Sequence, residues 1–314
     1  MRKTCLDQVY QLAKHDERIC FVGSDLGVGV LDEFRTKMPD RFFMEGINEA
    51  NVVGLASGLA ADGRIVYVNT IATFLTRRCY EQVVLDLALH NANVRLIGNG
   101  GGFVYAPLGP THEATEDIAI MRAIPRMGIV APADEVEMRN IMPQTVDHDG
   151  PLYIRLAKGY DPVVTPEHPG LEIGQSRVMR EGSDALILTT GITLSRAQKA
   201  ASRLALSGLN AAILHAPTIK PFDTETFLSM ADKTPVVVTV EEHSEIGGLG
   251  SCVAEIIAEA DFVAAKRFRR IGIPDVFADD YGSQNDLMAR YGITADRIVE
   301  TVQALTDVPQ TIAV

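Results

Sequence analysis

The sequence lacks the features of exported, membrane-spanning and disulfide-stabilised proteins. Its four cysteines show none of the paired spacings of a disulfide framework: Cys5, Cys20, Cys79 and Cys252. Isolated thiols are typical of a reducing compartment, so we expect a cytoplasmic protein. No apolar run reaches the roughly 18 residues of a membrane span. Charges also interrupt the first 16 residues, where a secretory signal would carry its apolar core. We therefore expect neither an export signal nor a membrane partner.

Basic charge is also scarce. The 314 residues include 29 Lys and Arg against 41 Asp and Glu, and the net charge is -12. Proteins bind nucleic acids and anionic membranes through basic stripes that neutralise phosphates, so we expect no nucleic-acid partner. The hydrophobic content of 46% is typical of a globular protein, and the length suggests two domains.

Common phosphate- and metal-binding motifs are missing as well. Neither a G-x-G-x-x-G dinucleotide motif after a first strand nor a G-x-x-x-x-G-K-[ST] loop occurs. No H-E-x-x-H, C-x-x-C or EF-hand spacing is present, so we expect no metal to be bound by this chain alone. Glycines do cluster at 98–102 and 246–250. We interpret the second cluster as a loop-to-helix turn that needs positive φ, with His243 beside it as a packed histidine.

What is present is an alternation of apolar strands and helices. In the first half of the chain we expect strands over 19–23, 64–70, 94–97, 127–131 and 152–155. Helices are expected over 4–14, 74–90, 117–123 and 135–146. Strands that alternate with helices of this length predict an α/β fold, in which a mostly parallel sheet is covered by helices on both faces.

The pattern lapses into Gly, Pro and charged residues before it resumes in the second half. We therefore expect a first domain over 1–165, a linker at about 166–182 and a second α/β domain over 183–314. In the second domain the expected strands cover 185–190, 211–215, 236–241 and 270–273. The expected helices cover 194–207, 284–291 and 294–305, with a further helix that starts near 247–250.

The segment 43–63 combines an acid with a helix of small residues. Apolar side chains recur there at intervals of three and four, as on one buried helical stripe: Val52, Val53, Leu55, Ala56, Leu59 and Ala60. Glu49 lies in the first turn of this helix. A carboxylate at that position is either a surface partner of the helix dipole or an acid held in a dry site for proton transfer.

The sequence GPTHEATED predicts a turn before the helix at 117–123. Gly-Pro forces the turn, Thr111 can cap the helix, and His112 would then lie on a loop above a parallel sheet, where α/β folds bind ligands. A capping threonine beside a surface histidine is an equally good interpretation. Farther upstream, Arg77 and Arg78 could form a solvated helix face, and we favour this interpretation for Arg78.

Taken together, these segments resemble the thiamine-diphosphate enzymes of the transketolase and deoxyxylulose-phosphate synthase group. The resemblance rests on INEANVVGLASGLA, TIATFLTRRCYEQV, GPTHE, RAIPRMGIVAPAD and VEEHSEIGGLGS, in that order, and covers nearly the whole chain. It implies a pyrimidine-binding domain followed by a transketolase C-terminal domain. The G-D-G sequence with which such enzymes hold the cofactor diphosphate through Mg²⁺ does not occur. We therefore expect the C-terminal subunit of a split transketolase, similar in layout to the beta subunit of 2-oxo-acid dehydrogenases.

The resemblance implies thiamine diphosphate as the cofactor, with its diphosphate and Mg²⁺ (or Ca²⁺) held by a separate N-terminal, diphosphate-binding subunit. Glu49 matches the glutamate that hydrogen-bonds the ring nitrogen N1′ of the aminopyrimidine and shares a proton with it. Phe74 matches the aromatic residue that stacks on the pyrimidine, and Asp25 matches an aspartate near the cofactor ring. An ordinary core phenylalanine and a loop aspartate are the competing interpretations.

The resemblance also implies a set of substrate-binding residues. His112 matches a histidine that hydrogen-bonds the oxygens of the donor. Arg155 and Arg2 match two arginines that hold a sugar phosphate, and we expect Arg77 and Leu108 beside the substrate as well.

Three of the matched positions depart from the family pattern. Leu108 replaces an aspartate that reads a donor hydroxyl, Gly100 replaces a histidine, and Gly29 replaces a phosphate-binding serine. Because specificity depends on such polar pairs, we expect a less phosphorylated or otherwise modified substrate in place of the usual pentulose phosphates.

We therefore expect a transketolase subunit that helps to move a two-carbon ketol unit from a ketose donor to an aldehyde acceptor. Its active site would lie between a homodimer of this chain and the diphosphate-binding subunit, in an α2β2 tetramer. The alternatives are a subunit of a 2-oxo-acid-decarboxylating enzyme and a non-catalytic regulatory subunit. The joint presence of Glu49, Phe74 and His112 argues against the regulatory subunit. The donor, the acceptor and the pathway are not identified by the sequence.

Overall fold

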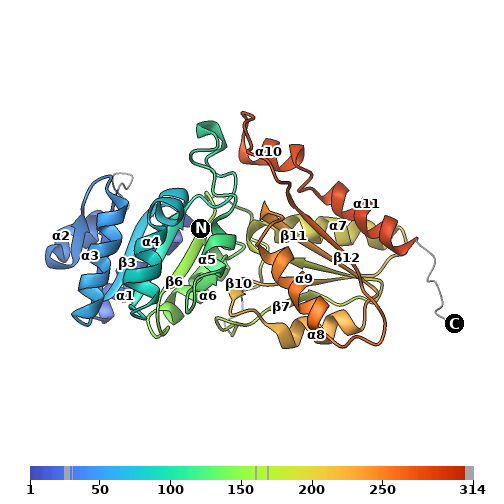
Figure 1. The fold of residues 1–314 in the computed structure, drawn as a ribbon, viewed down its shortest axis with the longest axis horizontal. Helices are drawn as coiled ribbons and strands as arrows, with labels where there is room; N and C mark the ends of the chain where they lie inside the picture. The colour runs from blue at the N-terminus through green and yellow to red at the C-terminus, as the bar shows by residue number, and fades with distance from the viewer. Residues whose placement is uncertain (25–28, 30, 160, 168–169, 308–314) are drawn as a thin grey trace.

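The computed structural model describes residues 1–24, 29, 31–159, 161–167 and 170–307. Two α/β units lie side by side along the long axis of the molecule (Figure 1). Each unit has a mostly parallel sheet with helices on both faces. The α/β fold expected from the alternation of strands and helices is therefore confirmed.

The first sheet has seven strands in the order β10-β5-β6-β4-β3-β1-β2. Their bounds are β1 (Ile19–Gly23), β2 (Phe42–Met44), β3 (Ile65–Ile71), β4 (Val94–Asn99), β5 (Gly128–Val130), β6 (Leu152–Leu156) and β10 (Thr218–Lys220). Neighbouring strands are parallel, except that β10 pairs with β5 in the antiparallel sense. The second half of the chain thus contributes an edge strand to the first sheet.

Helices bury an apolar layer against each face of this sheet. One layer lies beneath α1 (Arg2–His15), α2 (Asp32–Lys37) and α6 (Glu135–Ile141). The other layer lies beneath α3 (Glu49–Ala61), the π-helical turns η2 (Phe74–Arg78) and η3 (Val83–Ala88), the short α4 (Tyr80–Gln82) and α5 (Asp117–Arg122). Three 3-10 turns complete the unit: η1 (Pro39–Arg41), η4 (Ala106–Leu108) and η5 (Met142–Thr145).

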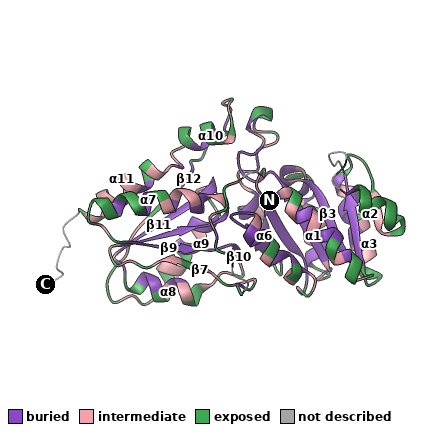
Figure 2. Cartoon of the chain, turned by 180° about the vertical axis from the view of Figure 1, so that it is seen from behind, coloured by how far each residue is buried: buried purple, intermediate pink, exposed green. Residues whose placement is uncertain are grey.

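The second sheet has five strands in the order β12-β11-β8-β9-β7. Their bounds are β7 (Arg177–Arg180), β8 (Ala185–Thr189), β9 (Ala211–His215), β11 (Val236–Ser244) and β12 (Arg267–Ile273). One face is covered by α7 (Leu194–Leu206), which follows the 3-10 turn η6 (Gly191–Thr193), with α10 (Gln284–Arg290) and α11 (Ala295–Thr306). The other face is covered by α8 (Thr224–Asp232) and α9 (Leu249–Glu259). The strands at the centre of both sheets are buried (Figure 2).

Two features of the chain differ from the expectations. The predicted linker at 166–182 contains β7, which pairs antiparallel with β9 at the edge of the second sheet. The single helix expected over 74–90 is interrupted, because the π-helical turns η2 and η3 flank α4. π-helical turns disturb the regular helical ladder and are frequent at functional sites.

Helix α3 places Glu49 at the ligand-binding edge of the first sheet. The helix follows the carboxyl end of β2, and α/β folds bind ligands outside the carboxyl ends of parallel strands. Its buried stripe is narrower than predicted: Val52, Val53 and Ala56 are buried, whereas the other predicted positions are only partly buried, namely Leu55, Leu59 and Ala60.

A buried arginine of the first unit pairs with an acid of that unit and also contacts the second unit. Arg155 on β6 donates from Nε to Oδ2 of Asp117 at 2.7 Å, and both side chains are almost completely buried. Its Nη2 also donates to the carbonyl oxygens of Ala114 at 3.1 Å and Glu242 at 2.9 Å, so one guanidinium contacts both halves of the chain. Burial disfavours the charged guanidinium, but the charge and hydrogen bond of Asp117, together with the nearby Glu242 and Tyr153, raise the pKa of Arg155 above its ordinary value.

The glycines at 98–102 allow the backbone to approach this ion pair closely. A Cβ at Gly101 would lie 2.6 Å from Nε of Arg155, and a Cβ at Gly102 would lie 2.4 Å from the Glu242 carboxylate. The same carboxylate accepts a hydrogen bond from the backbone N–H of Phe103 at 2.8 Å. The start of the loop after β4 is therefore tied to the second unit.

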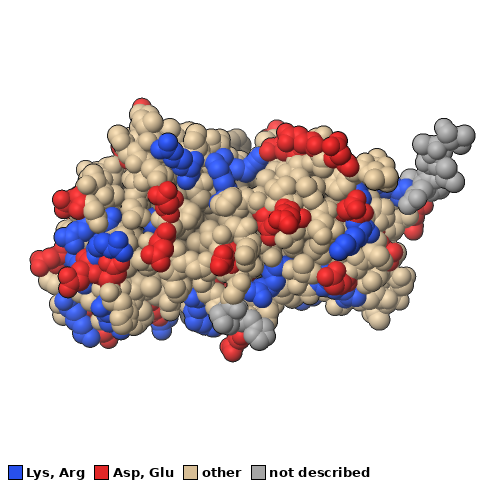
Figure 3. All heavy atoms as spheres, turned by 90° about the horizontal axis from the view of Figure 1, so that it is seen from below, with Lys and Arg blue, Asp and Glu red and all other residues tan. Residues whose placement is uncertain are grey.

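Charged residues of both signs are interspersed on the face of the molecule seen in Figure 3. In the part of the chain that the structure describes, no helix is long and apolar enough to cross a membrane. Within the same residues, no three His, Cys, Asp or Glu side chains gather into a group that could hold a metal ion. The four cysteines are unpaired, and burial raises the pKa of the Cys5 thiol to about 12, which keeps it in the unreactive thiol form.

Replacing Arg155 by methionine should destabilise the chain strongly. Methionine leaves Asp117 as an uncompensated buried charge, so we expect the free energy of unfolding to fall by about 3–5 kcal/mol. Arg18→Met is the matched control, because Arg18 pairs with Asp16 at the surface and its side chain is 58% exposed. This change should leave the stability nearly unaltered. Urea unfolding followed by circular dichroism measures both variants, and equally small effects would contradict the anchoring role of Arg155.

Candidate active site

Glu49 is the first residue of α3, and its side chain is only 2% exposed. Its Oε2 accepts a hydrogen bond from Nη1 of Arg78 at 2.6 Å. The free N–H groups at a helix start favour a negative charge at this position. Of the two interpretations of the sequence, the structure therefore supports an acid in a dry site over a solvated partner of the helix dipole.

Phe74 and His112 lie next to this ion pair. The Arg78 guanidinium lies over the Phe74 ring, with Cζ 4.4 Å from the ring centroid. The His112 ring meets the Phe74 ring edge-on, with the centroids 5.1 Å apart and an interplanar angle of 68°. Side chains four positions apart on a helix share a face, which brings Arg78 over Phe74 within η2. Three separate segments of the chain thus bring Glu49, Phe74 and His112 together.

Arg77 holds the loop that carries His112. Its Nη1 donates to the carbonyl oxygen of Pro110 at 3.0 Å, and its Nη2 donates to that of Glu113 at 2.7 Å. Its Nη2 also donates to Oε2 of Glu116 at 2.8 Å. The guanidinium is thus engaged by the loop itself. Contact between Arg77 and a substrate stays a prediction.

Thr111 does not cap the helix that follows it, which corrects the expectation. Helix α5 begins only at Asp117, and Thr111 Oγ1 lies 2.9 Å from Nδ1 of His112. The same hydroxyl donates to the carbonyl oxygen of Leu108 at 3.4 Å. The hydroxyl orients the imidazole, whose Nε2 has no hydrogen-bond partner among the described residues.

The remaining predicted site residues are Arg155, Arg2, Leu108 and Asp25. The predicted contact of Arg155 with a sugar phosphate is not supported, because its guanidinium is buried in the junction and hydrogen-bonded inside the protein. Arg2 begins α1 and lines a different surface hollow with residues of α6. Leu108 is 55% exposed on η4. Asp25 lies outside the residues that the structure describes.

Two of the departures from the family pattern have a local structural cause. Gly100 has a φ of +82°, and a Cβ at this position would lie 2.2 Å from the Tyr105 ring. The tyrosine ring thus fills the space that a histidine at this position would need. Gly29 has a φ of +95°, a conformation that favours glycine over serine.

Arg78 is the residue whose position the sequence analysis missed. Arg78 is exposed, as its interpretation as part of a solvated helix face implies, but its guanidinium also pairs with the buried Glu49 and covers the Phe74 ring. A signal was available in the sequence: the spacing of four between Phe74 and Arg78 places both on one face of a helix.

Glu113, the residue after His112, is a buried acid. The residue is 1% exposed, and neither carboxyl oxygen has a hydrogen-bond partner in the described part of the chain. Burial raises the pKa of Glu113 to about 7, against an ordinary value of 4.5. Nothing in the sequence around Glu113 distinguishes it from an exposed loop residue.

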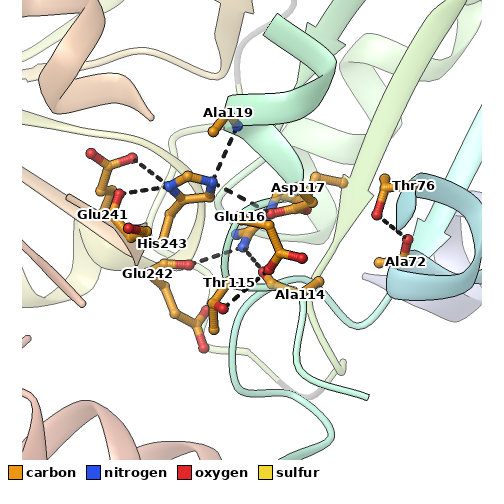
Figure 4. Close-up of polar contacts among 12 residues, drawn as sticks. Ala72, Thr76, Ala114, Thr115, Glu116, Asp117, Ala119, Glu241, Glu242 and His243 are labelled. Atoms are coloured by element: carbon orange, nitrogen blue, oxygen red, sulfur yellow. Dashed lines mark hydrogen bonds and ion pairs between the residues drawn. The ribbon is translucent and has the colours of Figure 1, made fainter. Parts of the chain in front are cut away.

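A polar cluster around His243 contacts the start of α5 (Figure 4). Nε2 of His243 accepts from the backbone N–H of Ala119 at 3.2 Å, and its Nδ1 donates to the carbonyl oxygen of Ser244 at 2.7 Å. The Glu241 carboxylate accepts from the first backbone N–H groups of α9 at 2.7 Å. Gly247 has a φ of +79°. A packed His243 and a loop-to-helix turn at 246–250 are therefore confirmed.

The family of the chain follows from two family models. The transketolase pyrimidine-binding domain matches residues 1–160, and the transketolase C-terminal domain matches residues 174–298. The chain belongs to the transketolase family.

This transketolase chain is similar to split subunits over nearly their whole length. A 6-deoxy-6-sulfo-D-fructose transketolase subunit of Clostridium sp. is 38% identical over 98% of this chain and 94% of its own length. An apulose-4-phosphate transketolase subunit of Phocaeicola vulgatus is 36% identical over 96% of this chain and 95% of its own length. A solved structure described as a split gene transketolase, an inactive beta4 tetramer, has a TM-score of 0.90 and 32% identity, with 98% of this chain and 99% of that chain covered.

Glu113 should make the stability of this transketolase chain depend on pH. The pKa of Glu113 is raised to about 7 in the folded state, so folding favours the protonated side chain. Its contribution to the free energy of unfolding is fully present below about pH 4.5 and is lost as the pH rises through 7. Glu113→Gln removes the ionisation, so we expect the free energy of unfolding to rise by about 1–3 kcal/mol at pH 8 and to change little at pH 5. Urea unfolding at both pH values measures this difference, and an equal effect at the two would contradict it.

Proposed function

We propose that this chain is the C-terminal subunit of a two-component transketolase, which transfers a two-carbon ketol unit from a ketose to an aldehyde. The observation that carries the proposal is the contact of the Phe74 ring with His112 and with the guanidinium of Arg78, which is paired with Glu49. The full-length similarity to transketolase subunits favours this activity over the decarboxylating alternative.

The residues present fit thiamine diphosphate. The planar guanidinium of Arg78 links a buried carboxylate and the face of an aromatic ring, because it bonds to Glu49 and lies over Phe74. An aminopyrimidine is also planar and bears nitrogen, so Glu49 and Phe74 offer it a hydrogen bond and a stacking surface. When bound, the cofactor supplies the reactive carbon that carries the two-carbon unit.

The chain's own residues would hold a proton and orient the reactants. Glu49 would hold at Oε2 a proton that it shares with the ring nitrogen of the pyrimidine, and its burial keeps water from competing for that proton. Phe74 would fix the plane of the ring. His112, oriented through Nδ1 by Thr111, would present Nε2 to an oxygen of the donor sugar.

We place the specificity of the enzyme at Leu108. Its exposed apolar side chain cannot accept the hydroxyl hydrogen bond that an aspartate would accept there. The two relatives bear the names of a sulfo-sugar and a sugar phosphate transketolase, so sugars with an anionic group are the substrate class that we propose. The donor should lack a hydroxyl contact that the pentulose phosphates make.

We propose that the active enzyme needs a second subunit besides this chain. The G-D-G sequence that binds the metal and the diphosphate does not occur in this sequence. We therefore place the diphosphate and its Mg²⁺ or Ca²⁺ on an N-terminal partner subunit, with a homodimer of this chain in an α2β2 tetramer. The description of the split gene transketolase as an inactive beta4 tetramer supports this arrangement.

Assaying the purified chain with and without its N-terminal partner tests the proposal. We expect ketol transfer only from the mixture, and only with added thiamine diphosphate and Mg²⁺. Turnover by the chain alone would contradict the two-component enzyme. Release of CO₂ from pyruvate by the mixture would favour the decarboxylating alternative, and a mixture that binds no thiamine diphosphate would favour a regulatory subunit.

Glu49→Gln should lower kcat of the assembled enzyme by about 100- to 10,000-fold, because an amide cannot take up and release the proton. Size-exclusion chromatography should show an unchanged assembly. Glu17→Gln, at an exposed position, makes the same change of charge and should keep full activity. Retained activity of Glu49→Gln would remove Glu49 from its proposed role.

A further inference from the structure

Arg78 makes the two contacts that the proposed function assigns to the cofactor pyrimidine. Its guanidinium is 2.6 Å from the Glu49 carboxylate, and it lies over the Phe74 ring at 4.4 Å from the centroid. A guanidinium is planar, carries N–H donors and stacks on aromatic faces, so it can make the same two kinds of contact as a flat nitrogen heterocycle. The aminopyrimidine and Arg78 therefore compete for the same carboxylate and the same ring face.

We propose that Arg78 occupies the pyrimidine position in the cofactor-free chain and must swing away when thiamine diphosphate binds. The inference rests on the proposed function, because it takes Glu49 and Phe74 as the pyrimidine contacts. Arg78 thus acts as a removable plug. It lowers the apparent affinity for the cofactor, because only the molecules in which Arg78 has moved away can bind thiamine diphosphate.

The burial of the partners explains why a plug is useful. The Glu49 side chain is 2% exposed, and a buried carboxylate without a partner is costly, so Arg78 compensates its charge until the cofactor arrives. The Arg78 side chain is 49% exposed, so a rotation of its flexible stem moves the guanidinium into water. The neighbouring Arg77 cannot take over, because the loop at 110–116 engages its guanidinium.

The first test examines the plug without the cofactor. Thermal unfolding of the chain is measured for the wild type, Glu49→Gln, Arg78→Ala and the double variant. We expect the two single shifts of Tm to be non-additive by about 2 °C, because either change alone breaks the same ion pair. Additive shifts would overturn the inference.

The second test measures the cofactor itself. Isothermal titration calorimetry gives the Kd of thiamine diphosphate for the complex with the N-terminal subunit, after the cofactor has been removed with a chelator. We expect Arg78→Ala to lower this Kd about fivefold and Arg78→Lys to have a smaller effect, because lysine keeps the charge and loses the planar stacking group. Arg18→Ala, which removes an arginine paired with Asp16 at the surface, should leave the Kd unchanged.

The outcomes separate this inference from the proposed function. If the wild-type complex binds thiamine diphosphate and Arg78→Ala binds it equally or more weakly, the plug is refuted and the transketolase function stands. If the wild-type complex binds no thiamine diphosphate, the proposed function fails and the inference fails with it.

Discussion

The ion pair between Arg155 and Asp117 is buried where the two α/β units meet, and neither charge would be stable there without the other. Asp117 begins α5, so the pair fixes the end of the loop that carries His112. The start of the same loop is fixed where the backbone N–H of Phe103 donates to Glu242. Because both ends of the loop are anchored at the junction, the histidine between them is held over the site at the edge of the first sheet.

Two neighbouring arginines, Arg77 and Arg78, bind different parts of the candidate site. Arg77 engages the backbone of the histidine loop, whereas Arg78 reaches back to Glu49 and covers the Phe74 ring. Both belong to a π-helical turn, an irregularity that is frequent where helices carry functional residues. The contacts that hold the histidine loop and the contacts with Glu49 and Phe74 thus originate in one short segment.

Much of the fold and part of the site could be predicted from the sequence. The parallel sheets followed from the alternation of apolar segments, and the positions of Glu49 and Phe74 followed from family motifs that are local in the chain. The strand β10 could not be predicted, because three residues that pair with a distant sheet carry no periodicity of their own. Arg155 was expected at the substrate, since a motif match does not tell whether a strand residue points to an active site or to a buried acid.

The sequence by itself determined the alternation of strands and helices, the family and the residues whose chemistry suits the proposed proton transfer. These depend on neighbours along the chain, through periodicity, turn residues and short motifs. Only the tertiary structure decided which charges pair. Glu49 meets Arg78 across 29 positions and Asp117 meets Arg155 across 38, and such pairs depend on distances between segments that folding brings together. For this reason the sequence indicated Glu49 and Phe74 as candidate cofactor contacts, and only the structure showed that Arg78 contacts both side chains.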